Sequence, residues 1–253
     1  MRLRLTPVVL SLCLFWLAAS PVRAQMSGEK PPVYTYVSQW TIPRTQWGDM
    51  AKAQQATNEI LDKLVADGTL LEYGSAETAV HDPKGPTHAG WFVGSSLAAI
   101  FKAEDAVRST IAADAALYGS GPHDDELLVS TDYDSHSGSF QNALLRGISS
   151  KLKPGMEPQF RAAWDQTIRP VLEKLMAEGA IHGWSYDNEW LIKEPGRMDT
   201  VILANGPEGL DRYVAAIREL LQQNPSALAP LIAATEPDSR QDFLLTVTAV
   251  HHK

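Results

Sequence analysis

Three residues at alternate positions, His182, Trp184 and Tyr186, are the strongest candidates for chemistry in this sequence. Alternate residues of a β-strand face the same side, so an imidazole would lie beside two aromatic rings. Imidazole titrates near neutral pH and can act as a general base, while aromatic rings can line a pocket for a planar ligand. We therefore predict His182 as the catalytic residue and Trp184 and Tyr186 as ligand-binding residues. The alternative is a half-exposed histidine beside rings that only pack the sheet.

Aromatic residues also mark the first half of the chain. Trp40 closes a segment rich in valine, threonine, tyrosine and tryptophan, which is typical of a strand, and His88 and Trp91 lie in a later segment of the same kind. We predict Trp40, His88 and Trp91 as further ligand-binding residues. Large rings are also what a two-sheet core uses, so core packing is the alternative for them.

Acidic residues suggest two other kinds of site. Asp132, Asp134 and His136 alternate and could hold a metal, but the segment has neither the pattern of an EF-hand loop nor a zinc signature. We expect a solvated loop there and no metal. Asp187 and Glu189 could form a carboxylate pair, yet acids this close in a turn are commonest on solvated surface.

Several classes of function are excluded by composition. Asp and Glu outnumber Lys and Arg by 30 to 22, for a net charge of −8, which argues against nucleic acid or an anionic membrane as partner. No G-x-S-x-G motif occurs, and Gly119–Pro122 lacks the spacing of a phosphate-binding loop. With 44% hydrophobic and 21% charged residues, the chain is neither disordered nor a multi-span membrane protein.

The first 24 residues are typical of a secretion signal. Arg2 and Arg4 precede the apolar stretch 8–19, and Val22 and Ala24 supply small residues at the −3 and −1 positions of a cleavage site before Gln25. The apolar stretch is about 12 residues long, whereas a membrane-spanning helix needs roughly 20. We expect a periplasmic or secreted protein; an uncleaved anchor is the alternative. The only cysteine lies inside this segment, so the mature chain would have no disulfide.

The remaining sequence repeats itself. Residues 61–68, LDKLVADG, return as LEKLMAEG at 172–179, a shift of 111 positions. Around each copy the pattern predicts a β-α-β-β-α-β order, the arrangement of ferredoxin-like folds. We expect a signal peptide at 1–24, one ferredoxin-like module at 25–134, a linker at 135–141 and a second module at 142–253. Pro170 should kink or divide the first helix of the second module.

Two fused modules of this kind resemble the dimeric α/β-barrel superfamily, in which two such sheets pack face to face. The resemblance rests on element order, duplication and module size, covers residues 33–251, and implies an α+β pseudo-dimeric barrel. The superfamily includes cofactor-free monooxygenases, haem-degrading enzymes, chlorite dismutase-like haem proteins and small isomerases, and fold alone does not choose among them. Its haem-binding groups typically place the axial histidine on a helix, and no histidine here falls in a predicted helix.

Two functions therefore stay open. The first is an exported protein that binds a small aromatic or apolar molecule, with cofactor-free oxidation or isomerisation. Its partner would be that ligand alone, without a cofactor, nucleic acid, or a membrane after signal cleavage. The second is a non-catalytic envelope protein whose aromatic residues are core. The protein could be a monomer, because fusion supplies within one chain what a dimer supplies elsewhere, or a homo-oligomer.

Overall fold

The computed structural model describes residues 30–83 and 85–253. The predicted signal peptide lies outside this range. Within the described residues no helix is both long and apolar enough to cross a membrane.

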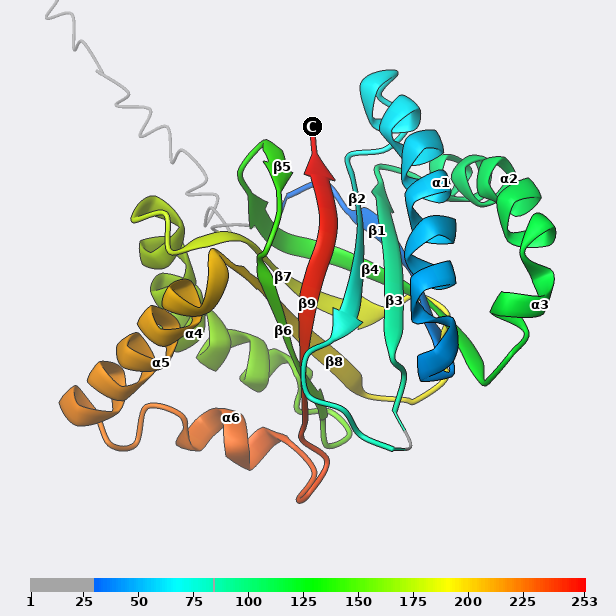
Figure 1. Cartoon of the computed structure of the whole chain (residues 1–253). Coiled ribbons are helices and arrows are strands. Elements are labelled where there is room, and N and C mark those ends of the chain that lie inside the picture. Colours follow the sequence, from blue (N-terminus) through cyan, green and yellow to red (C-terminus); the bar gives the residue numbers. More distant parts are fainter. Residues whose placement is uncertain (1–29, 84) are drawn as a thin grey trace, which may run out of the picture.

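The first half of the chain supplies four strands and two long helices (Figure 1). In order these are β1 (Val33–Trp40), α1 (Trp47–Ala66), β2 (Glu72–Thr78), β3 (His88–Gly94), α2 (Leu97–Ala113) and β4 (His123–Ser135). A short 3-10 turn, η1 (Arg44–Gln46), precedes α1, and a four-residue helix, α3 (Ala115–Tyr118), follows α2.

The second half repeats this order with two additions. Its elements are β5 (Gly138–Phe140), β6 (Leu144–Lys151), α4 (Glu157–Ala177), β7 (Ile181–Glu189), β8 (Arg197–Ala204), α5 (Gly206–Gln223), α6 (Ala229–Ala234) and β9 (Gln241–His252). Pro170 lies inside α4, which nevertheless continues as one helix. Most of the predicted linker is strand, since β4 runs to Ser135 and β5 pairs with β9.

Eight of these strands close into a barrel. The strand order is β2-β3-β1-β4 in the first half and β7-β8-β6-β9 in the second, and the pairings β4–β7 and β2–β9 join the halves at both edges. Each half is thus a ferredoxin-like module, and the expected pseudo-dimeric α/β barrel is confirmed. Helices α1 and α2 cover the outside of the first sheet, and α4 and α5 cover the second (Figure 1).

The duplication read from the sequence is visible in these elements. The first strands, β1 and β6, and the ends of the first helices, Ala66 and Ala177, are separated by the same 111 positions as the repeat. Gly68 and Gly179 follow those helix ends with φ of 81° and 68°, a left-handed conformation that glycine adopts without strain. The repeated glycine therefore ends the same helix twice.

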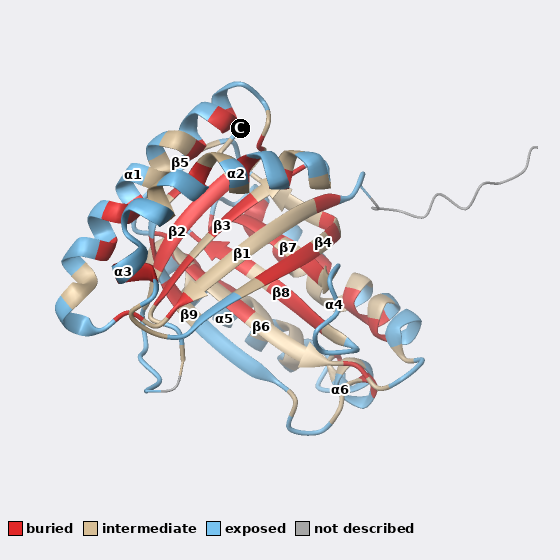
Figure 2. Cartoon of the chain, turned by 90° about the vertical axis from the view of Figure 1, so that its right-hand side faces the viewer, coloured by how far each residue is buried: buried red, intermediate tan, exposed pale blue. Residues whose placement is uncertain are grey.

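Apolar residues form four clusters, the smallest of them around Trp40 and Met50, and the buried positions lie mainly on the strands (Figure 2). One cluster joins α1 and α2 to the first sheet, and a larger one joins α4 and α5 to the second. A third cluster faces into the barrel and includes Trp91, Leu145, Leu203 and Leu245. Most of the strands are therefore covered on both faces, whereas β9 keeps exposed side chains, among them Gln241 and Asp242.

Candidate functional site

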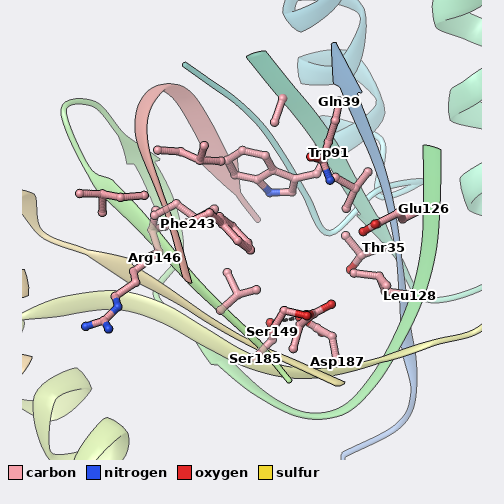
Figure 3. Close-up of a pocket in the computed structure, with 18 of the residues that line it drawn as sticks. Thr35, Gln39, Trp91, Glu126, Leu128, Arg146, Ser149, Ser185, Asp187 and Phe243 are labelled. Carbon is pink, nitrogen blue, oxygen red and sulfur yellow. Dashed lines mark hydrogen bonds between the residues drawn. The ribbon is translucent and has the colours of Figure 1, made fainter. Parts of the chain in front are cut away.

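A cavity of about 990 Å³ occupies the barrel interior, and Val80 and Pro86 of the loop after β2 and Leu210 of α5 also border it (Figure 3). Inward-facing residues of all eight barrel strands contribute to it. Representative lining residues are Thr35, Gln39, Glu72, Trp91, Glu126, Leu128, Ser149, Ser185, Asp187, Asp199, Leu203 and Phe243. This volume is in the range of small-molecule sites in proteins.

One wall of the cavity is apolar, and two glycines make room for its aromatic rings. A side-chain Cβ at Gly147 would lie 1.7 Å from Cζ of Phe243, and one at Gly74 would lie 2.1 Å from Cζ2 of Trp91. The Trp91 indole is further fixed because its Nε1 donates a hydrogen bond of 2.8 Å to Glu72. Such a wall suits the flat or aliphatic part of a ligand.

The opposite wall carries a buried carboxyl group, Asp187 (Figure 3). Ser130 donates a hydrogen bond to one carboxylate oxygen, and Ser185 donates to the other at 2.7 Å. Burial raises the pKa of Asp187 to about 7, the two serine hydrogen bonds oppose the rise, and the charge of Asp199 adds to it. A carboxyl group with this pKa can accept or release a proton near neutral pH.

Beside Asp187 lies an ion-pair network around one cation, Arg197. Its guanidinium contacts Glu126 at 2.6 and 3.1 Å, Asp199 at 3.1 Å and Glu189 at 3.5 Å. Burial raises the pKa of Asp199, and Arg197 opposes that rise. Glu189 also accepts hydrogen bonds from the backbone N–H groups of the β7–β8 turn. Arg197 thus pairs with three acids, and with Asp187 beside them this wall is acidic, which favours neutral or cationic ligands over anions.

The sequence did not predict this acidic wall. Asp187 and Glu189 were expected on solvated surface, and that expectation is wrong, because Asp187 is only 3% exposed and the Glu189 side chain 4%. The physical reason is closure of the barrel, which buries the inner face of β7 while α4 buries the outer face. The sequence did contain a signal for this burial: Ser185 and Asp187 alternate with Trp184 and Tyr186 in one strand, so they must lie on the face opposite the two rings.

His182 does not share a face with the two rings that follow it. A β-bulge falls between Ile181 and Gly183 in the pairing with β8, so the alternation shifts at His182. The imidazole instead stacks on Phe140 of β5, with ring centroids 3.8 Å apart. Burial lowers its pKa, and a hydrogen bond with Asn205 opposes that shift. His182 does not line the barrel cavity, and its catalytic role stays a prediction.

Trp184 and Tyr186 pack against α4 in the core of the second module. Trp164 of α4 lies 5.5 Å from Trp184 and 5.2 Å from Tyr186 between ring centroids, and Phe160 lies 6.3 Å from Tyr186. Trp184 also borders the barrel cavity, whereas Tyr186 does not. In the structure these two rings pack the sheet against α4, which was the alternative to ligand binding. Ligand binding by them stays a prediction.

The three residues predicted to bind ligand in the first module lie in different places. Trp91 faces the barrel cavity, and Trp40 faces a smaller cavity of about 270 Å³ under α1 and α2, where it stacks on His123 at 5.5 Å. His88 borders the large cavity but is fully buried, and burial lowers its pKa to about 4. Its ring is therefore neutral at pH 7, so Glu77 at 3.9 Å forms no ion pair with it there.

Metal and haem sites find no support in the described residues. They contain no group of three or more potential ligands that could hold a metal ion. The solvated loop expected at 132–136 is wrong for Asp132, which lies in β4, is 3% exposed and pairs with Arg161 and Arg169. All seven histidines lie in strands or loops, as expected, so no helix offers an axial ligand for haem.

Several solved structures align with most of this chain. A "putative monooxygenase" from Lactobacillus acidophilus aligns over 88% of this chain and 97% of its own, with a TM-score of 0.63 and 13% identity. A second protein so described, from Fusobacterium nucleatum, gives a TM-score of 0.65 at 9% identity, over 90% and 96% of the chains.

An anthrone oxidase-like protein aligns over 88% of this chain and 94% of its own, with a TM-score of 0.51 and 9% identity. The fold is therefore an α/β barrel of the dimeric type. No protein-family model matches the sequence, and no curated protein matches it. At these identities the likeness establishes the dimeric α/β-barrel fold alone, so function has to be argued from the cavity.

Proposed function

We propose that this is an exported protein that binds a small, mainly apolar or aromatic molecule inside its barrel and transfers a proton to or from it. The observation that carries the proposal is the two-sided cavity, with Trp91 and Phe243 on one wall and Asp187 on the other (Figure 3). The rings would hold the apolar part of the ligand, and Asp187 would face its polar group. The acidic wall favours a ligand that is neutral or positively charged.

The chemistry follows from the pKa of Asp187, which is about 7. As a general base Asp187 would remove a proton from carbon, and as an acid it would return that proton to a neighbouring carbon, which completes an isomerisation without any co-reactant. In a cofactor-free oxygenation the same deprotonation comes first. Dioxygen then oxidises the substrate CH₂ to C=O and leaves its second oxygen atom in water.

Support for oxygenation is weaker than support for binding. The solved structures with this fold include two described as putative monooxygenases and one described as anthrone oxidase-like. Those descriptions apply to those proteins, and the similarity to this chain is one of fold. The buried carboxyl group is common to both reactions. We therefore propose ligand binding and proton transfer as the function. An activity assay with and without dioxygen distinguishes oxygenation from isomerisation.

Native mass spectrometry and an absorption spectrum of the mature protein, purified gently from its own periplasm, test the binding proposal. We expect a bound small molecule that is lost in Val201→Trp, because Val201 faces the cavity. Ile232→Trp is the matched control, since Ile232 is 69% exposed on α6. Two results together would favour the non-catalytic envelope protein. One is a mass equal to that of the polypeptide alone, and the other is that neutral aromatic probes bind equally, or not at all, to the two variants.

Export has its own test. The intact mass of the protein from the periplasmic fraction should correspond to a chain beginning at Gln25. A chain that retains residues 1–24 and stays with the membrane pellet would identify the segment as an uncleaved anchor. This outcome would leave the cavity proposal unaffected.

A further inference from the structure

A hydroxyl, an imidazole and a carboxylate meet at the barrel end where β4 and β9 finish. Ser135 Oγ lies 2.9 Å from Nε2 of His252, and Nδ1 of His252 lies 3.0 Å from a carboxylate oxygen of Glu72. The other carboxylate oxygen accepts the hydrogen bond from Nε1 of Trp91 at 2.8 Å. All four side chains border the barrel cavity.

This is the order of groups that activates a serine nucleophile. A carboxylate on Nδ1 holds the imidazole in the tautomer whose Nε2 accepts a proton, and Nε2 is the nitrogen nearer to the hydroxyl. Such a constellation occurs on unrelated folds and is recognised by geometry. His252 belongs to the last strand, β9.

The fold fixes the three residues from both sides. The backbone of His252 pairs with Glu72 on β2 and with Gly138 on β5. Ser135 pairs with Gly183 of β7, where a side-chain Cβ would lie 3.3 Å from Cβ of Ser135, so the glycine keeps space around the serine. The side chains of His252 and Glu72 are 22% and 18% exposed, which shields their interaction from bulk water.

The hydroxyl also lies 3.2 Å from Nδ1 of His252. Being near both ring nitrogens, the hydroxyl is not yet in line with the lone pair of Nε2, and a turn of the imidazole is needed to align them. Catalytic hydrogen bonds are often long or poorly aligned in unliganded proteins and tighten with substrate bound.

We propose that Ser135, His252 and Glu72 form a reactive site that hydrolyses small carboxylic esters with an apolar acyl group. Ser135 Oγ bonds to the ester carbonyl carbon and its proton passes to Nε2 of His252. The bond from that carbon to the alcohol oxygen breaks, and His252 returns the proton to the departing alcohol. Water then cleaves the acyl-serine by the same steps, which releases the acid and restores Ser135.

This site is separate from the proton-transfer site of the proposed function. Asp187 is the pairing partner of Ser130 in the β4–β7 ladder, whereas Ser135 lies five residues further along β4, opposite Gly183. A failure of one therefore leaves the other standing, because Asp187→Asn leaves Ser135 intact and Ser135→Ala leaves Asp187 intact.

The experiment combines a covalent probe with a chromogenic ester. The mature protein is treated with an alkyl fluorophosphonate, and the labelled peptide is identified by mass spectrometry; in parallel, p-nitrophenyl butyrate is used to look for a burst of p-nitrophenolate. We expect label on Ser135 and a burst of one equivalent. Ser135→Ala should abolish both, and His252→Gln should slow labelling by at least about 100-fold.

Neighbouring residues supply matched controls. Ser137 donates a hydrogen bond to the carbonyl of Lys253, and His251 bonds to Asp62 on the outside of the barrel. Ser137→Ala and His251→Gln should label like the unmodified protein. Glu72 is a positioning residue, so Glu72→Gln should lose labelling that Glu72→Asp partly retains. Thermal unfolding confirms that each variant is folded.

Two results would overturn the proposal. One is the absence of label and burst in a folded, unmodified protein under conditions in which a known serine hydrolase reacts fully. The other is label on a serine other than Ser135, or label on Ser135 that His252→Gln does not slow. Either outcome would mean that the hydrogen bonds among the three residues only hold the strands together at this end of the barrel.

Discussion

Asp187 and Asp199 stand directly opposite each other in the β7–β8 ladder, and both side chains point into the barrel. Arg197 neutralises Asp199 at 3.1 Å, whereas Asp187 has two serine hydroxyls as its hydrogen-bond donors. The barrel thus holds one compensated and one uncompensated carboxyl group side by side. Burial, together with the smaller effect of the nearby Asp199 charge, raises the pKa of Asp187 and favours its protonated form.

Asp187 should make the protein less stable as the pH rises. Its pKa is raised from 3.8 to about 7 in the folded protein, so the folded state binds the proton more tightly than the unfolded state does. The free energy of unfolding should fall between about pH 4 and pH 7, by up to about 4 kcal/mol. Asp187→Asn should remove this loss, and so be the more stable protein at pH 8 but not at pH 4.

Urea unfolding of both proteins across this pH range measures the effect. Asp105→Asn is the control, because the Asp105 side chain is 69% exposed. A stability difference between Asp187→Asn and the unmodified protein that does not change with pH would contradict the prediction.

His88 should act with the opposite sign. Burial lowers the pKa of its imidazole from 6.5 to about 4, so protonation favours the unfolded chain. The stabilising effect of the neutral ring is fully present above about pH 6.5 and is lost as the pH falls to about 4, by up to about 3 kcal/mol. His88→Phe should flatten this part of the stability profile. The exposed His136→Gln should leave it unchanged, and an equal flattening in both variants would refute the assignment.

Two glycine-to-alanine changes should differ in their effect on stability. Gly74→Ala places its methyl group against Trp91, which is 8% exposed and hydrogen-bonded to Glu72, so the ring cannot move away. Gly147→Ala meets Phe243, which is 38% exposed and can turn into solvent. We expect a loss of about 3 kcal/mol for Gly74→Ala and about 1 kcal/mol or less for Gly147→Ala, measured by chemical denaturation. The reverse order would show that the rings are held differently.

Removing the guanidinium of Arg197 should be strongly destabilising. Arg197→Met leaves the carboxylates of Glu126, Asp199 and Glu189 buried without a counter-charge, which costs about 3–5 kcal/mol. Arg108→Met is the comparison, since Arg108 makes only exposed pairs on α2 and should change stability by less than about 1 kcal/mol. Urea denaturation at pH 8 distinguishes them, and similar small effects would mean that the network adds little.

The sequence alone determined the modular architecture. The repeat at 61–68 and 172–179, with its shared glycine, predicted two copies of one β-α-β-β-α-β unit, because helix periodicity and glycine helix ends are local properties of the chain. Strand pairings between distant segments, such as Glu72 with His252, are not local and leave no such signal.

Which face of each strand bears the site was decided only by tertiary structure. Simple alternation grouped His182 with Trp184 and Tyr186, but one bulged residue turned His182 toward Phe140. Barrel closure then buried Asp187 and brought Ser135, Glu72 and His252 together from three strands. The sequence therefore predicted where the strands lie. Which side chains contact one another was decided by the pairing of the two sheets at their edges, which closes the barrel around one interior.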